Sequence, residues 1–277
     1  MHRELRFLLK WLVIQGLANV LFLWYFPQQT RPVALADQIP DQIVDRYTAA
    51  TLAADAAIGL PQEISYRLMQ PAEQTGRFPL VVFLHGAGQR GADNLQQLRS
   101  FPELMASDER RQQFPCFLVA PQCPSGAWWT DPDLMTGIMA VVEEVTRNHP
   151  AIDRRRVYLT GISMGGFGAW SLAAGYPEAF AAVVPVCGRG DPEQARSLVG
   201  VPLWAVHGEA DTVVAPEGSR RMIEAIRTAG GTPQYTELPG VGHSSWRQAF
   251  DDSSGVLAWM FAQSRKSPAS FEGFRSR

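Results

Sequence analysis

Short apolar runs alternate with segments of helical periodicity from Pro61 to near the C-terminus, and this alternation restricts the fold more than any other feature. The run from Leu80 to Leu84 is unbroken, as is typical of a strand buried inside a parallel sheet. The expected strands cover residues 64–69, 80–84, 117–120, 157–160, 180–186, 203–206 and 234–238, and the expected helices cover 134–145, 165–175, 216–229 and 255–263. Strands that alternate with helices form a mostly parallel sheet covered on both faces, so the sequence predicts an α/β fold.

The composition excludes two classes of protein. Apolar residues make up 46% of the 277 residues and charged residues 19%, whereas a disordered chain would be poorer in apolar residues and richer in charge. The 25 Lys and Arg residues stand against 27 Asp and Glu residues, which gives a net charge of −2. No basic excess is available to neutralise phosphates, so we expect no nucleic-acid partner.

The first 36 residues differ from the rest of the chain. A basic start precedes an almost unbroken apolar stretch from Trp11 to Phe26, and Ala34-Leu35-Ala36 then supplies the small-x-small pattern that a signal peptidase recognises. This order favours a cleaved signal peptide over residues 1–36. The alternative is an uncleaved membrane anchor over residues 7–26, which at about 1.5 Å per residue would just span a hydrocarbon core of about 30 Å. Either interpretation predicts an extracytoplasmic protein, secreted, periplasmic or anchored and facing outward.

The three cysteines, Cys116, Cys123 and Cys187, do not form a disulfide framework, because at least one must be unpaired. Cys116 and Cys123 bracket the expected strand 117–120. Extended chain between them would separate them by about 23 Å, which is beyond disulfide reach. We therefore expect buried structural thiols.

The motif Gly161-Ile162-Ser163-Met164-Gly165 lies between an expected strand and an expected helix, and it is the clearest indication of chemistry. A serine hydroxyl is a poor nucleophile unless it is held exposed beside a base, and a sharp strand-to-helix turn does this. Glycines flank the serine because side chains there would collide with neighbouring elements. Ser163 is therefore the candidate nucleophile.

The candidate acid and base follow the serine at the ends of later strands. Asp211 comes just after strand 203–206, and His243 comes in the loop after strand 234–238. The order Ser, acid, His is typical of one class of serine hydrolase. Asp191, after strand 180–186, is the competing acid. His207 and His85 are expected to brace their turns instead of acting as bases.

An oxyanion hole needs backbone N–H groups aimed at the developing negative charge. Met164, the residue after the nucleophile, is expected to supply one. The glycine-rich loop after strand 80–84 is expected to supply the other, with Ala87 as the first choice and Gly88 as the second.

Taken together, these stretches resemble an extracytoplasmic esterase group of the α/β-hydrolases, which has often been labelled a predicted peptidase. The group is related to polyhydroxybutyrate depolymerases, feruloyl esterases and the prolyl oligopeptidase catalytic domain. The matching stretches are residues 84–91, 120–124, 161–166, His207-Gly208 with Asp211, and 242–246. The resemblance implies a Ser163–Asp211–His243 triad and hydrolysis without a cofactor or metal. It also implies that the strands ending at Cys123 and Cys187 lie three spacings apart, about 14 Å, so that this pair does not bridge either.

The resemblance covers about residues 62–263, the expected α/β-hydrolase catalytic domain. A linker or N-terminal extension over 37–61 is expected before it and a flexible tail over 264–277 after it. The large cap that many α/β-hydrolases carry is expected to be absent, because only Gly188 to Val201 lies at its usual insertion point. Trp128 and Trp129 are the candidate substrate contacts: the pair could bind an aromatic or sugar ring, or it could pack against the sheet. The predicted function is a serine carboxylesterase acting on small-molecule or polymer-linked esters. The alternatives are a peptidase of the prolyl-oligopeptidase type and a noncatalytic binding protein with this fold.

Overall fold

The computed structural model describes residues 39–55, 60, 62–73 and 75–269. Its eight strands are β1 (Tyr47–Leu52), β2 (Ile64–Met69), β3 (Phe78–Leu84), β4 (Phe117–Pro121), β5 (Ile152–Ile162), β6 (Ala182–Val186), β7 (Trp204–Gly208) and β8 (Gln234–Leu238). They form one sheet in the order β1-β2-β4-β3-β5-β6-β7-β8. The pairs β1–β2 and β2–β4 are antiparallel, and the other pairs are parallel. The mostly parallel sheet predicted from the sequence is therefore confirmed.

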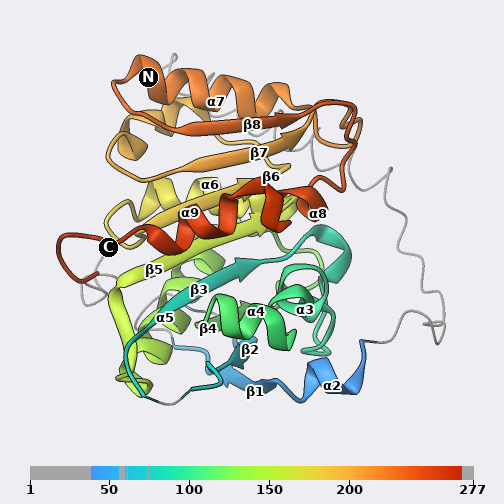
Figure 1. Ribbon diagram of the computed structural model, residues 1–277, viewed down its shortest axis with the longest axis vertical. Coiled ribbons are helices and arrows are strands. Elements are labelled where there is room, and N and C mark those ends of the chain that lie inside the picture. Colours follow the sequence, from blue (N-terminus) through green and yellow to red (C-terminus); the bar gives the residue numbers. More distant parts are fainter. Residues whose placement is uncertain (1–38, 56–59, 61, 74, 270–277) are drawn as a thin grey trace, which may run out of the picture. The chain divides into compact units, whose positions relative to one another are not determined.

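Helices cover both faces of this sheet (Figure 1). The α-helices are α2 (Asp41–Val44), α3 (Phe101–Met105), α4 (Asp108–Gln113), α5 (Pro132–Asn148), α6 (Met164–Gly175), α7 (Glu217–Thr228), α8 (Trp246–Ala249) and α9 (Val256–Ala262). Helices α5, α6 and α7 contribute to one buried cluster, and α3 and α9 contribute to the other. Strand β3 shows why two clusters form. Successive side chains of a strand point to opposite faces, so Val82 packs in the first cluster and Phe83 in the second.

The strand order creates a switch point at the centre of the sheet. From β3 the chain crosses to β4 on one side and then returns to β5 on the other side. Ligands of open α/β sheets bind outside the carboxyl ends of the strands at such a point. Ser163 follows β5 directly, and the glycine-rich loop follows β3. The fold therefore places these two segments at the same edge of the sheet.

Two segments that were expected to lie outside the folded domain are partly built into it. The segment predicted as a linker, 37–61, contains β1, which pairs antiparallel with β2 along its whole length. Residues 264–269 of the predicted tail are also ordered against β5, because the N–H groups of Arg265 and Ala269 donate to Arg155 O and Arg154 O, both at 2.9 Å. Backbone hydrogen bonds secure both segments, and a hydropathy pattern does not reveal such bonds.

The export segment predicted over residues 1–36 lies outside the described residues. Among the helices that the structure describes, none combines the length and the apolar character needed to cross a bilayer. The three cysteines are all free and buried, as predicted.

Candidate active site

Ser163 occupies a strained turn between β5 and α6. Its φ of 53° and ψ of −119° lie in a region that side chains rarely adopt, and such strain persists only where the surroundings enforce it. The Ser163 N–H donates to Val186 O at 3.0 Å and lies 3.3 Å from the Cys187 Sγ. A Cβ on Gly161 would lie 2.2 Å from Gly165 O, so the turn requires a glycine there. A strained strand-to-helix turn of this kind is the backbone geometry that a nucleophile elbow requires.

A continuous chain of hydrogen bonds joins the three residues predicted from the motif order. The Nε2 of His243 lies 2.9 Å from the Ser163 Oγ, and the Nδ1 of His243 lies 2.7 Å from the Asp211 Oδ2. The carboxylate is fully buried, and the N–H groups of Val213 and Val214 both donate to its Oδ1 at 2.9 Å. Because a carboxylate can only accept, Nδ1 carries the proton and Nε2 is left to accept from the serine hydroxyl.

The competing acid, Asp191, has a different role. It is exposed at the N-terminus of the 3₁₀ helix η5 (Pro192–Leu198), where its Oδ1 accepts from the Glu193 N–H at 3.1 Å. This bond caps a helix end. Asp211, not Asp191, is the carboxylate that His243 contacts.

The two segments predicted to supply oxyanion donors both lie next to Ser163. Met164 is the first residue of α6, where a helix leaves its N–H groups without intrahelical partners. Ala87 and Gly88 lie in the short 3₁₀ turn η3 (Ala87–Gln89), whose hydrogen bonds use the N–H groups of Gln89 and Arg90. The loop lies close to Ser163, since a Cβ on Gly86 would be 3.6 Å from the Ser163 Cβ.

Buried side chains hold this loop in place, and His85 is the central one. Its Nδ1 lies 2.7 Å from Gly86 O, and the Cys123 N–H donates to its Nε2 at 3.0 Å. The indole N–H of Trp129 donates to His85 O at 2.8 Å. Trp129 is only 1% exposed, so its prediction as a substrate contact is wrong. It packs beneath the loop and positions it.

The hydrogen bonds of His85 require a neutral ring, and this requirement makes stability depend on pH. Burial lowers the pKa of His85 from its ordinary 6.5 to about 4. The unfolded chain therefore binds the proton more tightly than the folded protein. The stabilisation is complete above pH 6.5 and is lost as the pH falls toward 4. We expect the free energy of unfolding to fall by about 2 to 3 kcal/mol from this group between pH 7 and about pH 4.5.

Denaturant unfolding of wild type and of His85→Gln at both pH values measures this effect. The variant should lose that part of the pH dependence even if it is less stable at pH 7. The comparison variant is His149→Gln, because His149 is half-buried and packs against Phe117 at the start of β4. Burial lowers the pKa of His149 as well, so this variant should lose a smaller part of the pH dependence than His85→Gln. A His85→Gln variant with the pH dependence of wild type would contradict the prediction.

Trp128 takes a different place from its neighbour. Its half-buried ring meets the edge of Phe167, the fourth residue of α6, at a centroid distance of 6.3 Å. The guanidinium groups of Arg90 and Arg189 lie over the two rings, at 5.8 Å from Trp128 and 5.7 Å from Phe167. No sequence pattern marks Phe167 as part of a site, because an aromatic residue at helical spacing is usually part of a core.

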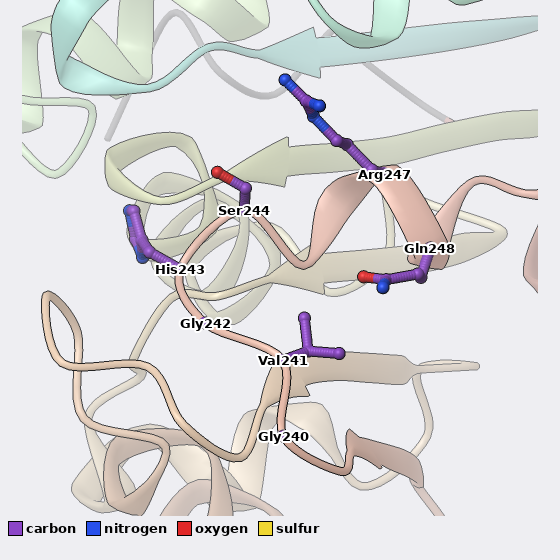
Figure 2. Close-up of a pocket in the computed structure, with 7 residues that line it drawn as sticks. All are labelled: Gly240, Val241, Gly242, His243, Ser244, Arg247 and Gln248. Atoms are coloured by element: carbon purple, nitrogen blue, oxygen red, sulfur yellow. The ribbon is translucent and has the colours of Figure 1, made fainter.

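A shallow pocket of about 430 Å³ opens beside the loop that carries His243 (Figure 2). Residues 240–244 line it together with Arg247 and Gln248. The side chains of Val241 and Gln248 point toward one another, whereas the imidazole of His243 points to the other side of the loop (Figure 2). Neither Ser163 nor Asp211 lines this pocket. Within the described ranges, no group of three or more His, Cys, Asp or Glu side chains is arranged to hold a metal ion.

The chain resembles several hydrolases of known sequence or structure. Poly(3-hydroxyalkanoate) depolymerase C of Paucimonas lemoignei is 31% identical over 229 residues, which cover 65% of this chain and 52% of the depolymerase. A crystal structure of a thermostable esterase is 34% identical with a TM-score of 0.74, covering 80% of this chain and 64% of that chain. An acylaminoacyl peptidase of Pyrococcus horikoshii shares the fold at 15% identity, with a TM-score of 0.63 and coverage of 86% and 46%.

These likenesses confirm the predicted α/β-hydrolase fold. The chain spans about half the length of the depolymerase and less than two thirds of the esterase. The model of one family matches residues 119–258, about half of the chain, and this range includes Ser163, Asp211 and His243. On that match, the chain belongs to the dienelactone hydrolase family of α/β-hydrolases.

Proposed function

We propose that this protein is a serine carboxylesterase in which Ser163 is the nucleophile, His243 the general base and Asp211 the acid that orients the base. The observation that carries the proposal is the continuous hydrogen-bond chain from the Ser163 Oγ through His243 to Asp211. The strained turn supports it as well, because it holds the serine at the carboxyl edge of the sheet, where the base can reach it.

The geometry suits acyl transfer through a covalent intermediate. The Ser163 Oγ attacks the ester carbonyl carbon while Nε2 of His243 takes the hydroxyl proton. The tetrahedral intermediate collapses, and Nε2 returns the proton to the leaving alcohol, which leaves an acyl-serine. Water then repeats the sequence and releases the acid. Asp211 keeps the proton of His243 on Nδ1 and stabilises the imidazolium that forms twice in each cycle.

Backbone N–H groups stabilise the oxyanion in this proposal. The Met164 N–H has no intrahelical partner at the N-terminus of α6, where the helix dipole also favours negative charge. The second donor comes from the loop held by His85, with Ala87 preferred over Gly88. On the acyl side, Trp128 is the proposed substrate contact, together with the ring of Phe167 that it meets.

Ester substrates are favoured over peptides because the depolymerase and the thermostable esterase, at 31% and 34% identity, are both named for ester cleavage. The peptidase likeness extends only to the fold. A noncatalytic binding protein would have no use for a complete Ser–His–Asp chain of hydrogen bonds.

A fluorophosphonate probe tests the proposal, because it labels only serines that a base activates. We expect labelling of Ser163 in the purified protein, and faster hydrolysis of p-nitrophenyl butyrate than of the matching anilide. A folded protein that does not react with the probe would contradict the hydrolase assignment. A preference for the anilide would replace the esterase with a peptidase.

We also expect an open site that selects short esters. The segment η5 stands where a cap would be inserted, and its apolar residues Ala195 and Leu198 are already buried, so it has no free apolar face to serve as a lid. Acetate and butyrate esters of p-nitrophenol should therefore be cleaved faster than palmitate. The rate on tributyrin should also pass the solubility limit without a jump. A sharp increase in rate on emulsified tributyrin, or a preference for the palmitate ester, would contradict the prediction.

A further inference from the structure

A second histidine contacts the carboxylate of Asp211. His207 is fully buried in β7, four residues before Asp211. Its Nε2 lies 3.2 Å from the Asp211 Oδ2 and 2.9 Å from Val214 O. Both neighbours of this nitrogen are acceptors, so Nε2 carries a hydrogen, which it donates to Val214 O while the Asp211 Oδ2 lies in contact.

This contact places a second imidazole against the carboxylate, beside the groups that donate hydrogen bonds to it. Two backbone N–H groups hold Oδ1, while His243 and His207 both meet Oδ2. Without His207, Oδ2 would have a single side-chain partner, and that partner is the base that must gain and lose a proton in each cycle. His207 supplies a partner that is not proposed to take part in proton transfer.

The other side of His207 leads back to the nucleophile. Its Nδ1 lies 2.8 Å from the Oγ of Ser219 in α7, and the same Oγ lies 2.8 Å from Gly188 O. Gly188 O and Nδ1 are both acceptors, so the single hydroxyl proton of Ser219 forms a hydrogen bond with one of them while the other stays in contact. Gly188 packs against the first turn of α6, since a Cβ on it would lie 2.4 Å from the carbonyl carbon of Gly166. The chain from Asp211 through His207 and Ser219 therefore ends three residues after Ser163.

Other ionisable groups near His207 are already engaged or neutral. Glu237 pairs with His207 in the register of β7 and β8, but its carboxylate binds Arg220 and Tyr235. Cys187 is a neutral thiol, because burial raises its pKa to about 12. Burial also lowers the pKa of His207, which favours the neutral ring with its hydrogen on Nε2. Nε2 therefore donates to Val214 O, and the Asp211 carboxylate is the charged group that it contacts.

We propose that His207 is a positioning residue, which fixes the Asp211 carboxylate against His243 and ties it to the turn that carries Ser163. The inference rests on the proposed function, because Asp211 needs a fixed orientation only if it orients a catalytic base. Misplacement of an orienting group lowers the rate of the chemical step without weakening substrate binding.

The experiment compares His207→Leu with His207→Gln, using p-nitrophenyl butyrate and counting active sites with the fluorophosphonate probe. Leucine fills the space without a donor, so we expect kcat per active site to fall on the order of 10- to 100-fold with KM unchanged. The Gln side chain keeps an N–H donor, so this variant should recover most of the lost kcat. The matched control is His149→Leu, which should keep the kcat of wild type because His149 packs on Phe117, away from the site.

A purely structural role for His207 would lower the yield of folded protein and leave kcat per active site unchanged. That result, or an equal loss of kcat in the Gln and Leu variants, would overturn the inference. If His207→Leu does not fold, His207→Asn replaces it, because the shorter amide cannot reach Oδ2. A wild-type protein that neither labels nor cleaves esters would refute the proposed function itself, whatever the variants do.

Discussion

Replacement of Ser163 by Ala is expected to lower kcat for p-nitrophenyl butyrate on the order of 10⁶-fold, because no other group can form the acyl bond. The fold should survive. The hydroxyl contacts His243, and alanine is no worse than serine at a φ of 53°. We therefore expect the free energy of unfolding to change by less than about 1 kcal/mol. Turnover and probe labelling measure the loss of activity, and denaturant unfolding of the same preparation measures the free energy of unfolding.

Two aspartate variants serve as the matched comparison for this result. Asp211→Asn should lower kcat on the order of 10³- to 10⁴-fold, because an amide facing Nδ1 favours the wrong tautomer of His243. Asp191→Asn should leave kcat unchanged, since Asp191 caps η5. Comparable rates for Ser163→Ala and wild type would reject the nucleophile. A larger loss in Asp191→Asn than in Asp211→Asn would reject the acid.

Sequence patterns predicted β3, β4 and β6 well, because these strands are buried at every position and read as apolar runs, whereas the charged start of β5 was not predicted. Strand β3 is buried at all seven positions. Strand β1 was missed for the opposite reason. It lies at the edge of the sheet, most of its side chains are exposed or half-buried, and its sequence, Tyr-Thr-Ala-Ala-Thr-Leu, carries no such run.

The order of motifs predicted which residues meet at the site, but not how neighbouring side chains divide between core and surface. Trp128 and Trp129 are adjacent in the sequence, yet one ring meets Phe167 and the other is buried against His85. Both positions hold the same residue type, so hydropathy does not distinguish them. Only the path of the loop decides which ring faces inward.

The contact between His207 and the Asp211 carboxylate could not be predicted from the sequence. A separation of four residues brings side chains together on a helix, but here the residues stand on a strand end and the turn after it. The contact depends on that turn, which the carboxylate of Asp211 itself stabilises by accepting from Val213 and Val214. A hydrogen-bonding side chain that shapes its own turn gives no periodic signal in a sequence.

Gly165→Ala is expected to have the largest effect on stability. The added Cβ would lie 1.8 Å from Leu84 O, 2.4 Å from the Leu84 carbonyl carbon and 2.8 Å from His85 O. All three are backbone atoms at the end of β3, which β4 and β5 hold in the centre of the sheet. Overpacking against side chains typically costs about 1–3 kcal/mol. Because this backbone cannot move aside, we expect a loss above about 3 kcal/mol, much of the 5–15 kcal/mol that stabilises a typical domain.

Gly175→Ala, at the other end of the same helix, separates packing from helix propensity. Alanine is a better helix former than glycine by about 1 kcal/mol, and this preference opposes the clash at Gly165. A Cβ on Gly175 would meet nothing within 4 Å, so this variant should be neutral or slightly more stable than wild type. Denaturant unfolding and soluble yield of the two variants, prepared in parallel, give the comparison. Equal stability of both would show that the contact between α6 and the end of β3 is not close, and the glycine of the motif would then need another explanation.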